Sequence, residues 1–567
     1  MDHPMIFHVL LFLCSLNVAV WACPDGCQCK GDEMLCIGLS NVPPLPSSTT
    51  AIYLSNCKIY SLKADDLTSL TNALGISIDD TALKEVQPGT FDSSVNLKAL
   101  GVTGTELQDL PEALFQNLHK LETLNLNRNK LVALHQKWFS PLKVLTALDL
   151  TQNQLTSIPM ETFHPLTELG YLLLARNYIS QLPIGAFKGL SKLEYLRLNK
   201  NLLQEITSGS FDDLGNLKEL SLQDNRITHL QHDLFSKMPK LTKLFLSNNQ
   251  LRTLPQGLFL HLPMLAQISL YENQLESIGP GVFGPMALQE LWLYDNKLSR
   301  LEDDTFKNLT QMRLLVLSRN RIKYVSTGAF RGLEQLGEVS LHTNLLKTLQ
   351  AGTFQGLPSL VNISLEHNFI NHLPVGFLQG LSYLGQIDLR NNTLANLPQQ
   401  DLDAISVAEE ILLHQNPWRC DKDILPLSNW LRKHPSKANQ TLVVCDTPHS
   451  LSGEMITWLA EEDLGVQSST QQIPLTSTER RKKPNTPPVK RSTSSPAVKT
   501  TSSSEYEVTS SGKGEEGHVP NHTSIILIVI AVVATVILSA TIISCLYWRM
   551  KKKGRGHIGH RSRNSVL

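Results

Sequence analysis

An asparagine recurs through the middle of this chain at a nearly fixed interval. The step between successive copies is about 24 residues, and the step that ends at Asn296 is shorter by a single position. Most copies close the same pattern, L-x-x-L-x-L-x-x-N-x-L, as in residues 121–131. In the same register Cys57, Thr81 and Thr105 hold the asparagine position of three earlier repeats. The thirteen asparagines are Asn129, Asn153, Asn177, Asn201, Asn225, Asn249, Asn273, Asn296, Asn320, Asn344, Asn368, Asn392 and Asn416.

Sixteen in-phase repeats predict a solenoid, because one coil of this length cannot bury its apolar face alone and must share a core with its neighbours. The L-x-L segment is expected to form a short strand whose leucines point inward while the intervening residues face water. The recurring asparagine should be buried, with its amide satisfying backbone groups where the strand leaves the sheet. The pattern therefore predicts an α/β-type solenoid, a leucine-rich repeat horseshoe, over residues 51–416.

A phenylalanine lies ten residues after most of the ladder positions, as the recurring asparagine positions are called below. We expect these rings to fill the core on the convex side as buried structural residues. In the last two such places the residue is Leu378, beside Phe377, and Leu402. The phenylalanines are Phe91, Phe115, Phe139, Phe163, Phe187, Phe211, Phe235, Phe259, Phe283, Phe306, Phe330 and Phe354.

Apolar runs near the two ends predict a type I single-pass protein of the plasma membrane. Residues 5–20 are apolar and lead into a small-residue cleavage pattern, which is typical of a signal peptide over residues 1–22. Residues 525–546 carry no charge and are long enough to cross a bilayer, so a transmembrane helix is predicted over 524–548. The tail, 549–567, holds seven Lys and Arg residues and no acid, which places it in the cytoplasm and the N-terminus outside the cell.

The net charge of zero conceals a segregation of charge. Without the seven basic residues of the tail, 44 basic residues remain against 51 acidic ones. This acidic remainder argues against nucleic acid as a partner, whereas the basic tail suits anionic lipid of the inner leaflet. The C-terminal residues Ser565, Val566 and Leu567 fit the ligand of a PDZ domain, although such endings are common by chance.

Cysteines gather at the two ends of the repeats, where a solenoid needs caps. Zinc is the alternative for the N-terminal group in residues 23–50, but a secreted chain favours two disulfides. A second pair lies in the predicted C-terminal cap, 417–465. Cys57 is expected to be a buried free thiol, and Cys14 and Cys545 fall in the two apolar end segments. The cap cysteines are Cys23, Cys27, Cys29, Cys36, Cys420 and Cys445.

Residues 466–523 lose the repeat pattern and are rich in Ser, Thr, Pro and Lys. Such a segment cannot bury a core, so a disordered, O-glycosylated stalk is predicted. Its basic cluster, residues 480–483, is a candidate for heparin binding or for proteolysis. Asn-x-Ser/Thr sequons for N-glycosylation occur at Asn308, Asn362, Asn391, Asn439 and Asn521.

Outward strand residues should build the concave surface, and two groups on it are candidates for ligand binding. The first group, called the aromatic patch, lies on three adjacent repeats and could anchor a partner, or its rings could only stack and stiffen the sheet. It consists of Phe245, Tyr271, Trp292 and Tyr294. The second, called the basic stripe, suits an acidic partner or a sulfated glycan, or is only a solvated face. It consists of Arg128, Tyr171, Arg176, Tyr195, Arg197 and Lys200.

No motif for catalysis is present, and neither an enzyme activity nor a cofactor is predicted. The sequence has no Gly-rich phosphate loop, no G-x-S-x-G and no His-Glu-x-x-His. His342 and His367 lie on neighbouring repeats, but without a third ligand they are interpreted as surface histidines and not as a metal site. These observations favour a protein that works by binding.

Several segments resemble one family of cell-surface leucine-rich repeat proteins, which includes leucine-rich repeat-containing protein 15, platelet glycoprotein V and the carboxypeptidase N regulatory subunit. They are FGPM at 283–286, LWLYDN at 291–296, SLHTN at 340–344 and the cap segment that begins NPWRCD at 416. Many caps of this class carry a second cysteine at the place of Lys422, so one bridge is implied here, which favours the first-named relative over glycoprotein V.

The resemblance covers nearly all of residues 23–460 and implies an adhesion receptor. Such a receptor would bind matrix proteins such as collagen, fibronectin or laminin and promote cell migration. A glycoprotein V-like chain would instead be a structural or regulatory subunit, with the platelet glycoprotein Ib-IX complex as its partner.

Overall fold

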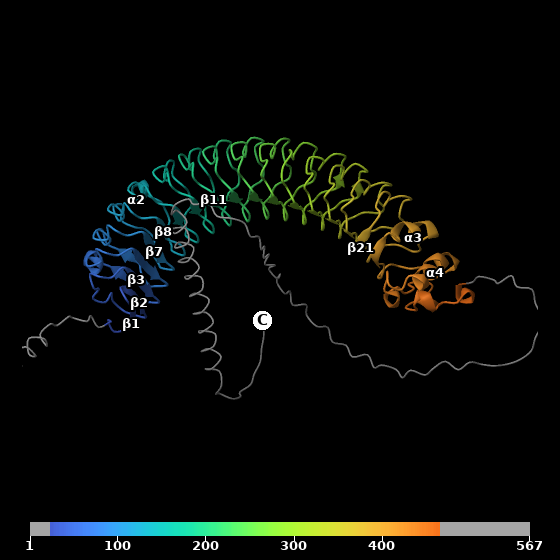
Figure 1. The fold of residues 1–567 in the computed structure, drawn as a ribbon, viewed down its shortest axis with the longest axis horizontal. Helices are drawn as coiled ribbons and strands as arrows, with labels where there is room; N and C mark the ends of the chain where they lie inside the picture. Colours follow the sequence, from blue (N-terminus) through green and yellow to red (C-terminus); the bar gives the residue numbers. More distant parts are fainter. Residues whose placement is uncertain (1–22, 465–567) are drawn as a thin grey trace, which may run out of the picture. The chain divides into compact units, whose positions relative to one another are not determined.

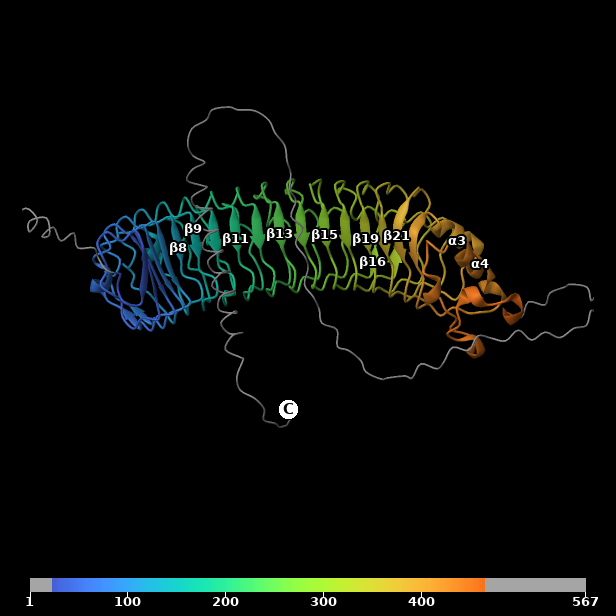
Figure 2. The ribbon, with the colours of Figure 1, turned by 60° about the horizontal axis from the view of Figure 1, so that its bottom comes forward.

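The structure, a computed structural model, describes residues 23–464 (Figure 1). The predicted signal peptide, stalk, transmembrane helix and tail lie outside the described residues, as does Asn521. Within residues 23–464, no helix is long and apolar enough to cross a membrane. The described residues form one curved solenoid whose strands line the inner, concave side (Figures 1 and 2).

One strand per repeat joins a continuous parallel sheet, in the order of the sequence (Figure 2). Because neighbouring strands pair in register, the central leucines align, as Leu172 aligns with Leu196. The sixteen strands are β3 (Ala51–Ser55), β5 (Gly75–Asp79), β7 (Ala99–Thr103), β8 (Thr123–Asn125), β9 (Ala147–Asp149), β10 (Tyr171–Leu173), β11 (Tyr195–Arg197), β12 (Glu219–Ser221), β13 (Lys243–Phe245), β14 (Gln267–Ser269), β15 (Glu290–Trp292), β17 (Leu314–Val316), β19 (Glu338–Ser340), β20 (Asn362–Ser364), β21 (Leu384–Asp388) and β22 (Ala408–Leu412).

The short repeat does not disturb the sheet. Ile268 of β14 still pairs with Leu291 of β15, so the missing residue is absorbed on the convex side. There the chain comes close to the preceding coil, and a Cβ added to Gly284 would lie 3.0 Å from the Cα of Leu260. A glycine at this place permits the close approach of the two backbones.

The convex side is built of turns rather than of regular helices, so the α/β character of the prediction was wrong. Among the described residues the α-helices are α2 (Gln136–Phe139), α3 (Gln399–Ile405) and α4 (Leu425–Lys433). Between β10 and β11, for example, residues 174–194 form corners and turns, and a helix of one or two turns is not stable by itself. Short 3-10 turns are η1 (Ala64–Leu67), η2 (Lys422–Ile424), η3 (Gln440–Leu442), η4 (His449–Leu451), η5 (Ile456–Trp458) and η6 (Glu461–Leu464).

The ladder asparagines are buried and fully hydrogen-bonded, as the spacing predicts. Asn225 donates from Nδ2 to the carbonyl oxygens of Leu198 and Leu222, each at 3.0 Å, and its Oδ1 accepts from the Leu203 amide at 3.1 Å. Of the three early substitutes, Thr81 fills the position less completely, because its buried hydroxyl has no partner among the described residues, whereas the Thr105 hydroxyl accepts from the Leu107 amide at 3.2 Å. The Cys57 thiol is buried and free.

The phenylalanines form a buried row on the convex side of the core. The rings of Phe187 and Phe211 stack with their centroids 5.9 Å apart, and those of Phe330 and Phe354 at 5.8 Å. Leu402 is also fully buried, so an aliphatic side chain can take the same place. Strand-side leucines, the asparagine ladder and these rings together form a core shared by all repeats.

Both ends of the solenoid are capped. At the N-terminus β1 (Cys27–Lys30) runs antiparallel to β2 (Glu33–Ile37), and β2 pairs with β3. Two short edge sheets, β4 (Ser61–Leu62) with β6 (Glu85–Val86) and β16 (Arg300–Leu301) with β18 (Tyr324–Val325), lie along the coils. At the C-terminus α4 packs on the last coil, where the Trp430 indole donates to the Ser406 hydroxyl at 2.8 Å. The disulfides are Cys23–Cys29, Cys27–Cys36 and Cys420–Cys445.

Candidate functional site

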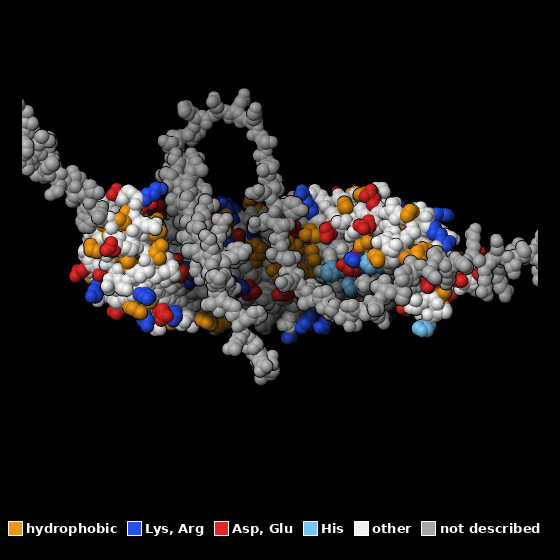
Figure 3. Space-filling view, turned by 90° about the horizontal axis from the view of Figure 1, so that it is seen from below, with side chains coloured by type: hydrophobic (Ala, Val, Ile, Leu, Met, Phe, Trp, Pro, Cys, Tyr) orange, Lys and Arg blue, Asp and Glu red, His pale blue; other side chains and the backbone are white. Residues whose placement is uncertain are grey.

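The structure places the aromatic patch on the concave sheet and brings its four residues together. Phe245 on β13 and Trp292 on β15 lie on either side of Ser269, which is the register partner of both. Since Ser269 is small, the two rings can share the space above it. All four patch side chains are half-buried, and Figure 3 shows hydrophobic side chains gathered on this face, with acidic side chains beside them.

Two rings of the aromatic patch stack directly. Tyr271 and Tyr294 lie with centroids 4.5 Å apart and planes 6° apart. Burial raises the pKa of Tyr294 to about 12, and the neighbouring Tyr271 adds to the shift. The carboxylates of Glu272 and Asp295 act in the same direction. Stacking is therefore present, but it leaves ring surface open to a partner.

Two aliphatic residues that the sequence reasoning missed extend the patch. Leu314 and Val316 occupy the outward ends of β17, and Val316 is the register partner of Trp292. Both side chains are half-buried. The sequence does mark these two residues: each is apolar at an outward position of the repeat, where most repeats carry a polar residue.

A corner of unusual backbone conformation ends each strand. The residue before each ladder position has a positive φ, for example 55° at Arg128, 56° at Arg176 and 58° at Lys200. Its amide donates to the next coil, as from Arg128 to the carbonyl oxygen of Thr151 at 2.8 Å. This bond holds a conformation that non-glycine residues seldom adopt. The three cations therefore lie along the edge of the concave face.

Acidic residues of neighbouring coils neutralise much of the basic stripe. Arg128 forms ion pairs with Asp79 at 2.8 Å and with Asp80 at 2.9 Å. Arg197 pairs with Glu219 at 3.2 Å. Lys200 lies 3.8 Å from Asp224, which leaves Arg176 as the stripe cation without an ion pair among residues 23–464. The stripe is thus weaker as an anion site than its composition suggests.

The two tyrosines of the stripe form a stack of their own. Tyr171 and Tyr195 lie with centroids 4.7 Å apart and planes 3° apart. Burial raises the pKa of Tyr171, and the nearby Tyr195 and Glu194 act in the same direction. Tyr171 remains 48% exposed.

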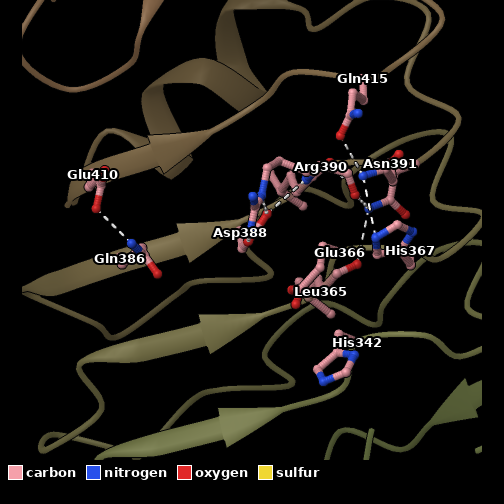
Figure 4. Close-up of polar contacts among 12 residues, drawn as sticks. His342, Leu365, Glu366, His367, Gln386, Asp388, Arg390, Asn391, Glu410 and Gln415 are labelled. Carbon is pink, nitrogen blue, oxygen red and sulfur yellow. Dashed lines mark hydrogen bonds and ion pairs between the residues drawn. The ribbon is translucent and has the colours of Figure 1, made fainter. Parts of the chain in front are cut away.

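A polar group occupies the concave face toward the C-terminal end (Figure 4). Arg390 donates from Nε to both carboxylate oxygens of the buried Asp388, at 2.9 and 2.8 Å. Burial raises the pKa of the nearby Glu366 carboxyl, and the Asp388 charge contributes. His367 Nε2 lies 3.5 Å from Asn391 Nδ2. Over the described part of the chain, no three metal-binding side chains form a group that could hold an ion.

The sequons divide between the two faces. Asn362 lies on β20 of the concave sheet, and Asn391, at a corner, donates to Gln415 Oε1 at 2.8 Å. Asn308 is exposed and donates to the Phe283 carbonyl oxygen at 3.1 Å, on the side of the phenylalanine row. Asn439 is exposed in the C-terminal cap.

The repeats of this chain match those of a known protein family. The profile described as "Leucine rich repeat" matches residues 95–155, 119–179, 167–227, 215–275, 239–293, 265–322, 286–346, 311–370 and 336–394. The chain belongs to the leucine-rich repeat family. The matches run without a gap from residue 95 to residue 394, which is more than half of the chain.

Curated relatives match over short segments of this leucine-rich repeat protein. The human platelet glycoprotein Ib beta chain is 40% identical over 52 residues, which are 9% of this chain and 25% of the relative. Human leucine-rich repeat-containing protein 15 is 46% identical over 44 residues, 8% of either chain. Biglycan of Xenopus laevis is 42% identical over 59 residues, 10% of this chain and 16% of the relative. The match thus spans a quarter or less of each relative.

Solved structures share the fold. A leucine-rich repeat protein of Leptospira interrogans has a TM-score of 0.50 and 24% identity, covering 69% of this chain and 90% of its own. The Toll–Spatzle complex of Drosophila has a TM-score of 0.51 and 20% identity, covering 77% of this chain and 72% of the other. At these identities the likeness extends to the fold alone.

Proposed function

We propose that this leucine-rich repeat protein is a type I single-pass receptor of the plasma membrane that binds a protein of the extracellular matrix, such as collagen, fibronectin or laminin, and promotes cell migration. Its action is binding, without catalysis. The observation that carries the proposal is the aromatic patch on the concave sheet, with Trp292 and Phe245 half-buried on either side of Ser269. Large aromatic side chains dominate the binding energy of protein interfaces.

The proposal draws on the two-cysteine C-terminal cap and on the resemblance to leucine-rich repeat-containing protein 15, which matches 8% of this chain. The sequons on the concave face support the aromatic patch as the place where the ligand binds. Glycans on Asn362 and Asn391 would cover the concave face of the C-terminal repeats, because an attached sugar is bulky and solvated. A protein ligand would then reach the concave face ahead of Asn320, where the aromatic patch lies.

A second candidate is a structural or regulatory subunit whose solenoid holds another chain, in the way of glycoprotein V in a platelet complex. The observation in its favour is the similarity to the platelet glycoprotein Ib beta chain. The two functions differ in what the purified protein does. A receptor binds matrix alone, whereas a subunit is recovered with a stoichiometric partner.

The deciding experiment measures binding of the purified full-length protein to immobilised collagen, fibronectin and laminin. The double variant Trp292→Ala, Tyr271→Ala should weaken binding to the recognised matrix protein by about 30-fold, or roughly 2 kcal/mol. The control is Tyr178→Ala, which removes an aromatic side chain that is 54% exposed but lies beyond the ladder asparagine, off the concave strands. Equal binding by the folded double variant and the control would refute the aromatic patch as the ligand site.

A further inference from the structure

Acidic side chains bracket the aromatic patch at both ends of its strands. Along β15 and the residues that follow it, Glu290, Trp292 and Tyr294 take alternate positions and therefore share the concave face. Asp295 follows at the corner, and Glu272 holds the corner of the preceding coil. The rings thus lie between a carboxylate at the start of the strand and carboxylates at its end.

Most of these carboxylates have no basic partner. Within residues 23–464, neither Glu290 nor Glu272 forms an ion pair or a side-chain hydrogen bond, and Glu272 is exposed. Asp295 pairs with Arg319 at 2.9 Å. Gln267 separates Lys243 of β13 from Glu290 in the sheet register. Arg313 precedes β17 and donates its amide to the Gln289 carbonyl oxygen at 2.8 Å, but its side chain forms no ion pair among the described residues. The surface of the patch is therefore both apolar and negative.

Several acids elsewhere on the concave face have a basic partner, although Glu338 of β19 and Glu366 also form no ion pair among the described residues. The acids of the basic stripe are paired with Arg128, Arg197 and Lys200, as described above. Toward the C-terminus Asp388 is held by Arg390. Carboxylates that no side chain within residues 23–464 neutralises are available to a partner, and complementary charge directs which partner binds.

We propose that the occupant of the aromatic patch is a basic protein segment, with an apolar side chain on the rings and Arg or Lys side chains at Glu290 and Glu272. The inference rests on the proposed function and specifies its partner. The two ends of the patch lie about five residues apart along the strand direction, or ~16 Å. An extended segment with basic residues about four positions apart meets both, and a guanidinium over an aromatic face gains cation–π attraction.

A sulfated or otherwise acidic partner is excluded from this surface by the same charges. The Glu272 and Asp295 carboxylates also contribute to the raised pKa of Tyr294, after burial and the neighbouring Tyr271. The partner must therefore bring the positive charge that the patch lacks.

The test uses the purified full-length protein and two synthetic peptides. One peptide carries two arginines four positions apart with a leucine midway; the other carries glutamates in place of the arginines. We expect the arginine peptide to bind, to bind more weakly at high salt, and to lose about tenfold or more in affinity with the double variant Glu272→Gln, Glu290→Gln. The glutamate peptide should not bind.

The matched control is Glu276→Gln with Glu334→Gln, which removes the same two charges from exposed residues that lie off the concave strands and form no ion pair within the described region. This control should bind the arginine peptide as the wild-type protein does. Failure of the arginine peptide to bind, equal binding of both peptides, or an equal loss in both glutamine variants would overturn the basic partner.

The same variants are assayed on the matrix protein, which separates this inference from the proposed function. Weakening by both Trp292→Ala and the double variant Glu272→Gln, Glu290→Gln supports both ideas. Weakening by Trp292→Ala alone keeps the proposed function and overturns the basic segment. If neither change affects matrix binding, the aromatic patch is not the ligand site and both ideas are wrong.

Discussion

Two stacked tyrosine pairs on the concave face have nearly the same geometry and opposite surroundings. Tyr171 and Tyr195 lie 4.7 Å apart, and Tyr271 and Tyr294 lie 4.5 Å apart. Both distances follow from the spacing of adjacent strands, about 4.8 Å. The first pair lies at the start of β10 and β11, whereas the second lies just beyond the ends of β14 and β15. Stacking is therefore a consequence of the repeat and does not by itself mark a binding site.

The neighbouring charges distinguish the two pairs. Beside the first pair, Glu194 is satisfied by Lys218 at 2.8 Å. Beside the second pair, Glu272 has no ion-pair partner among the described residues. A stacked pair contributes roughly 0.5–1.5 kcal/mol beyond the burial of its area, wherever it lies. The unpaired carboxylate is what makes the second pair a candidate for recognition.

The largest expected effect is a loss of stability at the C-terminal cap, and it tests whether either tyrosine pair depends on the ends of the solenoid for its stability. Cys420→Ser should leave Cys445 unpaired, open the C-terminal cap and cost ~2–5 kcal/mol. Because each coil contacts only its neighbours, hydrogen exchange should rise in the last coils and decline toward both tyrosine pairs. Peptide mapping that recovers both cysteines as free thiols in the wild-type protein would contradict the premise.

The next effect compares the ladder beneath the two pairs. Asn177 and Asn273 make equivalent bonds, each donating to the preceding coil at 3.0 Å. Replacing either with Ala leaves buried backbone groups unpaired and should cost roughly 1–3 kcal/mol, with the same loss in both variants. Thermal denaturation checks this, with Asn125→Ala as the control: it removes one bond from the Asn127 amide, 3.1 Å long, at a half-exposed position and should cost less than either ladder variant. A clear difference between the two ladder variants would mean that the regions differ in the core as well.

The sequence predicts the parts of this molecule that repeat. The constant interval between ladder positions specifies the strands, the ladder and the phenylalanine row, because each coil shares its core with the adjacent coils. The α/β character was predicted wrongly, since the repeat pattern does not specify how the chain returns between strands. The ion pair between Arg128 and Asp79 escaped detection because its partners lie 49 residues apart, two coils away from each other.

A smaller expected effect distinguishes the two tyrosine pairs by the pH at which their hydroxyl groups ionise. Tyr294 has a pKa raised to about 12, so it stays neutral in the folded protein while an unfolded tyrosine ionises near 10. Its contribution to stability is present below about pH 10 and is lost as the pH rises toward 12. In a spectrophotometric titration, Tyr294→Phe should remove the tyrosine ionisation near pH 12, whereas Tyr171→Phe should leave that step in place. The reverse result would mean that burial and acidic neighbours do not set the second pair apart.

The smallest expected effect concerns the sequon nearest to the second pair on the opposite face. Asn308 lies one coil beyond β15, but its side chain donates to Phe283 on the convex side. The exposed Thr310 completes the sequon, so Thr310→Ala removes a glycan while keeping this hydrogen bond. Matrix binding should change by about twofold or less, as for an ordinary surface substitution.

The matched variant Thr393→Ala removes the sequon of Asn391 on the concave face. It also removes the hydrogen bond from the Thr393 hydroxyl to the Phe369 carbonyl oxygen, so its melting temperature is measured alongside. If the ligand lies over the second tyrosine pair, neither glycan touches it, and both variants should bind matrix as the wild-type protein does. A strong loss of matrix binding in Thr310→Ala alone would place the ligand site on the convex side and would contradict a site at either tyrosine pair. Tighter matrix binding in Thr393→Ala alone would mean that the ligand site extends beyond Asn320, toward the repeats that the Asn391 glycan covers.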